Sequence, residues 1–236
     1  MHIVCDKDGL ELQKKAAIEL ALHLKEYNKL PVLLLISGGS SLGLLNFLDL
    51  KDITQNLTVS FLDERYTTKN ENTNFYNFSN TRMYTYLQKN NNSVIDLTIK
   101  QNETLKDMTQ QFEDFLYEWK ETHKNGKIVI TQGIGDDGHT AGIMPFPENE
   151  VEFEKLFEGD NWTSGYDAGE KNKFSKRITV TNTFLKNVVD VSVVYAKGEN
   201  KKRVLKKVLG ENVSPYILPA TILHEMKEVH IFCDVL

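Results

Sequence analysis

The chain has 236 residues, of which 40% are hydrophobic, so it is long enough to bury the core of a soluble enzyme. Its formal net charge of -5 argues against a general nucleic-acid-binding protein. No apolar run approaches the ~18 residues of a membrane-spanning helix and no signal-peptide core is present, so we expect a cytoplasmic protein without a membrane partner. The two cysteines, Cys5 and Cys233, suit a reducing compartment and offer no metal-binding spacing.

Helical and strand patterns alternate along the chain. Apolar residues recur at helical spacing over residues 10–27 and 103–123, and residues 148–175 are expected to form a short helix and a flexible crossing loop without chemistry. Strands are predicted at residues 32–36, 57–62, 128–130, 177–181, 188–195 and 229–233, and further helices at 42–48, 198–209 and from 219. This order predicts an α/β fold: one Rossmann-like domain over residues 1–236, a three-layer αβα sandwich with a mostly parallel sheet of about six or seven strands.

A glycine-rich turn joins the strand at 32–36 to the helical pattern that follows it. The turn reads Ser37-Gly38-Gly39-Ser40-Ser41. Backbone N–H groups at the start of a helix attract anions, so this turn suits a phosphate. It lacks the G-K-[ST] ending of a Walker A motif, so a nucleoside triphosphate is not implied. The alternative is an ordinary strand-to-helix turn with a serine cap.

The next strand ends in Asp63-Glu64-Arg65, which places acidic and basic side chains at its exit. Ligands of open α/β sheets bind outside the carboxyl ends of the strands, so this position favours a functional role. The same side chains could instead form a solvated ion pair.

Residues 128–145 read I-V-I-T-Q-G-I-G-D-D-G-H-T-A-G-I-M-P, a short buried strand followed by glycines and reactive side chains. Gly133 to Gly138 fits the G-x-G-x-x-G of a dinucleotide-binding turn. However, Gly142, Pro145 and Pro147 leave too little room for the helix that such a turn opens.

Two further interpretations concern the polar side chains of the same segment. In one, Asp136 or Asp137 caps a short helix and His139 is an ordinary loop histidine. In the other, His139 is an acid/base group that a neighbouring carboxylate orients in a glycine-lined pocket.

Two cations follow later in the chain. Arg177 opens a strand whose residues alternate between polar and apolar, and Lys201 lies in the first turn of a predicted helix after Gly198. A lysine at that end opposes the helix dipole unless an anion lies nearby. His224 and His230 are not at metal-ligand spacing, so we expect both to be structural.

These segments together resemble a known family. G-I-G-D-D-G-H-T-A-G-I-M-P resembles the signature of the glucosamine-6-phosphate isomerase/6-phosphogluconolactonase superfamily and is closer to the lactonase branch. Further matches occur in the family's order and cover nearly the whole chain: Ser37 to Ser40, Asp63 to Arg65, Arg177 to Thr181, Gly198 to Lys201 and Leu218 to Ala220.

The resemblance implies hydrolysis of the lactone ester of 6-phospho-D-glucono-1,5-lactone, in the oxidative pentose phosphate pathway, without a metal or organic cofactor. His139 would move the proton, and Asp137 would orient it, although Asp63 is an open alternative as the partner of His139. The implied substrate-binding residues are Ser37, Gly38, Gly39, Ser40, Asp63, Arg65, Arg177 and Lys201. The partner is then a small phosphosugar lactone, and the chain is expected to be a monomer or a weak homo-oligomer.

Two other functions remain open at this point. One is the sister chemistry of the superfamily, the isomerisation and deamination of glucosamine 6-phosphate. Deaminases of the family have a glutamate where this chain has Met144, directly before Pro145, and a tyrosine where it has Arg65, which favours the lactonase. The other is a sugar-phosphate sensor that keeps the pocket but has no turnover.

Overall fold

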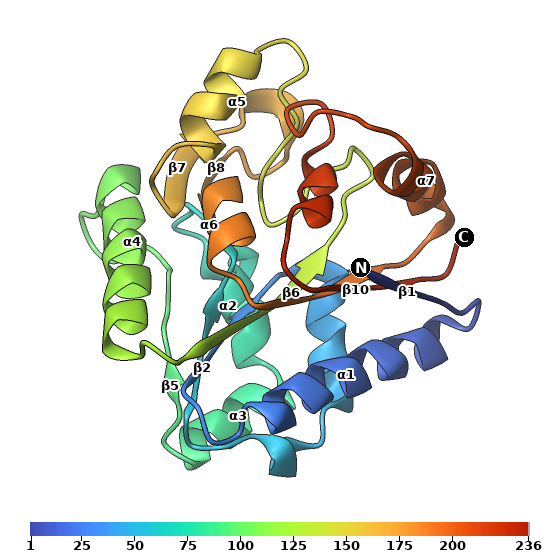
Figure 1. The fold of residues 1–236 in the computed structure, drawn as a ribbon. Helices are drawn as coiled ribbons and strands as arrows, with labels where there is room; N and C mark the ends of the chain where they lie inside the picture. Colours follow the sequence, from blue (N-terminus) through green and yellow to red (C-terminus); the bar gives the residue numbers. More distant parts are fainter. Residues whose placement is uncertain (236) are drawn as a thin grey trace.

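The computed structural model describes residues 1–235, which are built around a seven-stranded sheet in the order β1-β10-β9-β6-β2-β3-β5 (Figure 1). All neighbouring strands are parallel. Parallel neighbours need long crossover connections, so most of the chain between the strands is helical. The strands are β1 (His2–Cys5), β2 (Val32–Ile36), β3 (Leu57–Phe61), β5 (Ser93–Val94), β6 (Lys127–Gly133), β9 (Val191–Ala196) and β10 (Val229–Cys233).

Helices cover both faces of this sheet. α1 (Gly9–Glu26) packs against β9 and β10 on one face, and α4 (Leu105–Thr122) and α6 (Asn182–Asn187) lie on the other (Figure 1). Asp8 begins α1, because its side chain accepts hydrogen bonds from the backbone N–H groups of Leu10 and Glu11. The remaining helices are α2 (Asn74–Ser79), α3 (Arg82–Lys89), α5 (Glu150–Phe157) and α7 (Lys202–Gly210).

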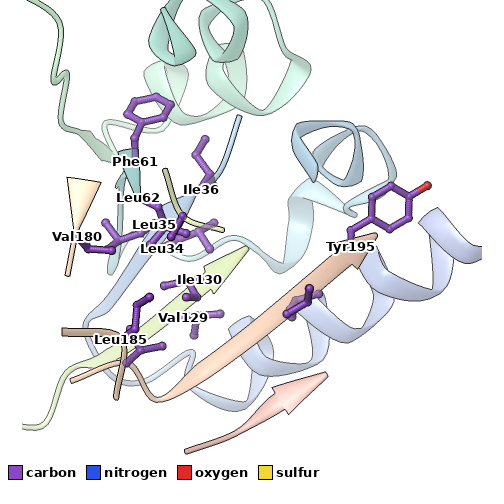
Figure 2. Close-up of a cluster of buried hydrophobic side chains, with 14 of the residues drawn as sticks. Leu34, Leu35, Ile36, Phe61, Leu62, Val129, Ile130, Val180, Leu185 and Tyr195 are labelled. Atoms are coloured by element: carbon purple, nitrogen blue, oxygen red, sulfur yellow. The ribbon is translucent and has the colours of Figure 1, made fainter. Parts of the chain in front are cut away.

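The core lies where the middle strands meet these layers. Every residue of β2 is buried, as expected for a parallel strand covered on both faces. Val180 and Leu185 come from elements above the sheet and lie near the central strand that carries Val129 and Ile130 (Figure 2). The predicted fold class, an α/β sandwich of three layers with a mostly parallel sheet, is confirmed.

A second, antiparallel sheet was not predicted. It has the order β4-β8-β7, with β4 (Asp63–Arg65), β7 (Thr163–Asp167) and β8 (Lys176–Val180). The strand predicted at 177–181 therefore exists but belongs to this smaller sheet. The prediction of a crossing loop is wrong for residues 163–167, because T-S-G-Y-D has no strand periodicity and becomes β7 by pairing with β8.

Two predicted helices are 3-10 helices in the structure. They are η1 (Gly39–Phe47), after the glycine-rich turn, and η6 (Pro219–His224). None of the helices described in residues 1–235 has a stretch both long and apolar enough to cross a bilayer.

Candidate active site

A cavity of about 590 Å³ opens at the carboxyl ends of β2, β3, β6 and β9. This is the edge at which open α/β sheets bind ligands. All ten residues proposed from the sequence as catalytic or substrate-binding line it: Ser37, Gly38, Gly39, Ser40, Asp63, Arg65, Asp137, His139, Arg177 and Lys201. The structure thus brings together side chains that are far apart in sequence.

The loop after β6 presents a histidine–carboxylate pair to this cavity. The Nδ1 atom of His139 lies 2.5 Å from Oδ1 of Asp137, and the same oxygen accepts the backbone N–H of His139 at 3.1 Å. The position of Asp137 is therefore fixed by both the ring and the backbone of its partner. Asp63, the other carboxylate considered from the sequence, lies beside Arg177 instead, with 3.9 Å between Oδ2 and Nη1.

Gly135 makes room for this pair. A Cβ atom at this position would overlap the ring of His139 and the carboxylate of Asp137. The backbone N–H of Gly135 also donates to the carbonyl of His139 at 2.8 Å, which closes the loop over itself. The glycine is needed here for close approach and not for a dinucleotide.

The structure contradicts the helix that the two other interpretations of this segment require. No helix begins between Gly133 and Pro147 in the described structure, and the segment forms turns and one isolated bridge between Thr140 and Ile143. A dinucleotide-binding turn requires that helix, and so does a helix-capping role for Asp136 or Asp137.

Buried polar side chains hold the loop against the sheet. The Ser192 hydroxyl on β9 donates to Oε1 of Gln132 at 2.6 Å, and the Gln132 amide donates to Thr140 at 3.1 Å. Thr140 in turn donates to the carbonyl of Gly133 at 2.8 Å. All three side chains are fully buried, so each hydrogen bond lost would leave a polar group without a partner. The loop that carries His139 is therefore fixed by two central strands.

Burial and hydrogen bonding oppose each other at Asp137. Burial would raise the pKa of Asp137, but the hydrogen bond and positive charge offered by His139 outweigh it and leave that pKa below its ordinary value. Asp137 is thus an anion beside the ring at neutral pH, and a carboxylate there can hold the ring in one orientation.

Two arginines face each other across the small sheet. Arg65 on β4 and Arg177 on β8 are directly opposite in register, an arrangement that like charges normally disfavour. The side chain of Arg177 is 6% exposed, and its Nε has no hydrogen-bond partner within the described chain. Arg65 donates from Nη1 to the carbonyl of Asn72 at 2.6 Å and lies over the Phe174 ring. An anion in the cavity would relieve both the repulsion and the unpaired Nε.

Lys201 reaches the cavity from the start of α7 but is already paired. Its Nζ lies 2.6 Å from Oδ1 of Asp136, whose other oxygen accepts from the Asn200 amide at 2.7 Å. The hydrogen bond from Lys201, followed by that from Asn200, holds the pKa of Asp136 below its ordinary value. A lysine at the start of a helix is unfavourable without a nearby anion, and Asp136 is the anion that pairs with Lys201.

Four cavity residues outside residues 133–142 were not among the site residues assigned from the sequence. Asn172, Lys173 and Phe174 lie in the segment to which no chemistry was assigned, and yet they line the cavity. Asn74 also lines it and donates from its side-chain amide to the carbonyl of Asp63 at 2.8 Å. The segment carries no periodic pattern, and only the pairing of β7 with β8 brings it here. The one signal in the sequence was an aromatic residue between lysines and asparagine in an otherwise polar loop.

Glu64, between the two polar residues that face the cavity, has a structural place. Its carboxylate is fully buried and accepts backbone N–H groups of Arg65, Asn74 and Phe75 at 2.7 to 2.9 Å. Burial raises the pKa of Glu64 from 4.5 to about 7, in spite of these three donors. Glu64 therefore ties the end of β4 to the first turn of α2.

Comparison with known proteins decides the family. The model of the family described as glucosamine-6-phosphate isomerases/6-phosphogluconolactonase matches residues 7–232. The chain belongs to this isomerase/lactonase family. The resemblance inferred from the sequence motifs is thereby confirmed. A search of the curated proteins by sequence finds no match.

Solved structures with the same fold include both branches of the isomerase/lactonase family. The 6-phosphogluconolactonase of Trypanosoma brucei has a TM-score of 0.76 at 20% identity, over 99% of this chain and 95% of that one. That of Shewanella baltica has a TM-score of 0.75 at 18% identity, over 100% and 98%. A monomeric glucosamine-6-phosphate deaminase has a TM-score of 0.73 at 21% identity, over 99% and 97%. At these identities the likeness establishes the fold, which the two activities share.

Proposed function

We propose that the chain hydrolyses 6-phospho-D-glucono-1,5-lactone to 6-phospho-D-gluconate, a step of the oxidative pentose phosphate pathway. The observation that carries the proposal is the 2.5 Å contact between Nδ1 of His139 and Oδ1 of Asp137. Both residues line the same cavity as Arg65, Arg177 and Lys201. A general base and a set of cations are what an anionic ester requires for attack by water.

The reaction uses the two nitrogens of His139 differently. Nδ1–H donates a hydrogen bond to Asp137 and keeps its proton, so the lone pair of Nε2 is free to take a proton from water as the oxygen attacks the lactone carbonyl. The bond from that carbon to the ring oxygen then breaks, and the ring oxygen receives the proton from Nε2. Acid/base help of this kind contributes ~10²- to 10⁴-fold to the rate.

The phosphate of the substrate is assigned to the cationic side of the cavity. Arg177 has an unpaired Nε, and the turn at residues 37–40 lies at the start of η1, where backbone N–H groups are free of intrahelical partners. Lys201 is the third contact, and it can bind phosphate and Asp136 together because an ammonium group has three donors. We further propose that residues 1–236 form one domain that acts as a monomer or a weak homo-oligomer.

The deaminase activity is the second candidate, since a deaminase shares the fold. Met144 argues against it. Its side chain is fully buried and does not line the cavity, and its backbone N–H donates to the hydroxyl of Tyr166 at 3.1 Å. A thioether has no charge and accepts no proton, so the glutamate of the deaminases has no substitute at this position.

A turnover assay on the purified chain tests the proposal. We expect acid release from 6-phosphogluconolactone well above its spontaneous hydrolysis, and no ammonia from glucosamine 6-phosphate under the same conditions. Ammonia release without lactone hydrolysis would reverse the assignment. Binding of 6-phosphogluconate without turnover of either substrate would instead indicate a sensor.

A further inference from the structure

A second group of metal-binding side chains lies away from the cavity. Glu19 and His23 are one turn apart on α1, and His230 is the second residue of β10, against which α1 packs (Figure 1). The cavity is at the carboxyl ends of the parallel strands, whereas His230 is near the amino end of β10. The group is therefore at the opposite edge of the sheet from His139.

The ring of His23 is enclosed but has no hydrogen bond. Its side chain is 8% exposed, and both of its ring nitrogens are buried without a hydrogen-bond partner in the described chain. Buried polar atoms of native proteins nearly always have a partner. Oε1 of Glu19 lies 3.2 Å from Nε2. A ligand between the two would satisfy both.

The donor atoms have the spacing of a coordination shell. Oε1 of Glu19 is 3.2 Å from Nε2 of His23 and 3.1 Å from Nδ1 of His230, and donor atoms of all three residues lie within 4.8 Å of one another. Zinc bonds of about 2.0 to 2.2 Å in a tetrahedron put neighbouring donors about 3.4 Å apart. The three side chains can therefore surround one ion with small rotations.

Each histidine also has a carboxylate at its outer nitrogen. Nε2 of His230 lies 2.9 Å from Oε1 of Glu228, and Nδ1 of His23 lies 3.7 Å from Oε2 of Glu26. Such carboxylates orient the imidazoles that ligate metals and make them more basic.

We propose that Glu19, His23 and His230 form a zinc site that joins α1 to β10. Imidazole nitrogens favour zinc over magnesium or calcium, and the remaining position is open to water. The ion would connect α1 to β10, two elements that are far apart in the sequence, so its role is structural. The inference does not depend on the proposed function.

Zinc titration of the full chain, stripped with a chelator and followed by calorimetry, tests the site. One zinc ion should bind per chain, and Tm should rise by a few degrees at ~100 times Kd, while magnesium should leave Tm unchanged. His23→Gln and His230→Gln should each weaken binding at least ~10-fold. Glu19→Gln, at a partly exposed position, should do the same without a folding defect.

Two further variants separate this site from other histidines. His123→Gln, at the end of α4, removes a half-buried histidine outside the group and should bind zinc like the wild type. His139→Ala removes the histidine of the cavity and should also keep the zinc. Loss of binding in His139→Ala alone, equal binding in all variants, or no binding below millimolar zinc would each overturn the proposal. Cobalt in place of zinc should give the visible absorption of a tetrahedral site in the wild type and lose it in Glu19→Gln.

Discussion

The position of His139 depends on residues that have no reactive group of their own. Gly135 leaves the space that the ring occupies, and the buried hydrogen bond between Ser192 and Gln132 fixes the strand pair from which the loop leaves. Ala141, two residues after the histidine, has a left-handed backbone with φ of 50°, which costs about 1 to 2 kcal/mol for a residue with a Cβ. The hydroxyl of Thr179 donates to the carbonyl of Ala141 and holds it there. Local strain of this kind is common at functional sites.

His139→Ala should remove catalysis and leave the fold intact. The side chain is 32% exposed and its ring bonds only to Asp137, so little packing is lost. We expect kcat for the lactone to fall at least ~10²-fold, with Tm within a few degrees of the wild type. His123→Ala is the matched control, because it removes a histidine outside the cavity and should keep the wild-type rate. Near-normal turnover of His139→Ala would remove this residue from the mechanism.

Lys201→Ala should raise KM more than it lowers kcat. The substitution removes the proposed phosphate contact and leaves Asp136 without its cation at the edge of the cavity, so binding of an anionic substrate should be weakened for both reasons. Lys202→Ala is the control, since that neighbouring side chain is exposed and pairs only with Glu199 at 3.6 Å. The double variant Asp136→Asn/Lys201→Ala should have a lower KM than Lys201→Ala alone, because the anion left at the cavity is removed. A fall in kcat alone, with KM unchanged, would contradict the anchor role.

Much of the candidate site was predictable because it is built from short, contiguous motifs. Ser37 to Ser40 directly follow one buried strand, and Asp137 to His139 come shortly after another, so strand and loop could be recognised together. The partner of His139 was not predictable, because the choice between Asp63 and Asp137 depends on where the small sheet puts Asp63. The link between Lys201 and Asp136 joins two loops whose distance no local pattern encodes.

At the scale of elements, the buried carboxylate of Glu64 links β4 of the small sheet to α2. Glu64 accepts three backbone N–H groups, two of them from the first turn of α2. An anion at that end of a helix is favourable, yet full burial disfavours the charge. The raised pKa shows that burial prevails, which makes the link between β4 and α2 sensitive to pH.

Stability should therefore fall as pH rises through the titration of Glu64. The unfolded carboxyl loses its proton near 4.5, whereas burial raises the pKa of the folded one to about 7, so the unfolded state binds fewer protons between these values. The contribution is complete below about 4.5 and is lost by about 7, at most about 3 kcal/mol in total. Urea unfolding of the wild type and of Glu64→Gln across this range measures it.

The difference in unfolding free energy between the two proteins should decrease with rising pH. Glu71→Gln, at an exposed neighbouring position, should show no such trend. A difference that increases with pH would mean that the three N–H groups keep Glu64 ionised in the folded state.

The elements that were predicted correctly differ in kind from those that were missed. β2, α1 and α4 have clear periods and long buried faces, so their sequences alone determine them. β7 has mixed polar residues and forms only by pairing with β8, and β1 is a mostly exposed edge strand with a weak apolar pattern. η1 is a 3-10 helix, although its residues favoured an α-helix. The spacing of apolar residues in so short a segment does not distinguish the two kinds of helix.

At the scale of the whole molecule, the order of strands across the sheet differs from their order along the chain. β2, β3 and β6 are neighbours near its centre, while β1 lies at one edge and pairs only with β10. The sheet therefore unites segments from both ends of the described chain: His2 is opposite His230, and Cys5 is opposite Cys233.

The pairing of β1 with β10 affects the order in which the sheet can form during synthesis on the ribosome. Among the strands of residues 1–235, β1 is synthesised first and its partner β10 last, so the backbone N–H and C=O groups of β1 have no sheet partner while the strands between them are made. β2, β3 and β6 pair with one another and are complete much earlier, so the middle of the sheet can associate before its β1 edge. Because unpaired strand edges attract other chains, we expect the nascent β1 segment to be open to association with other chains until β10 emerges.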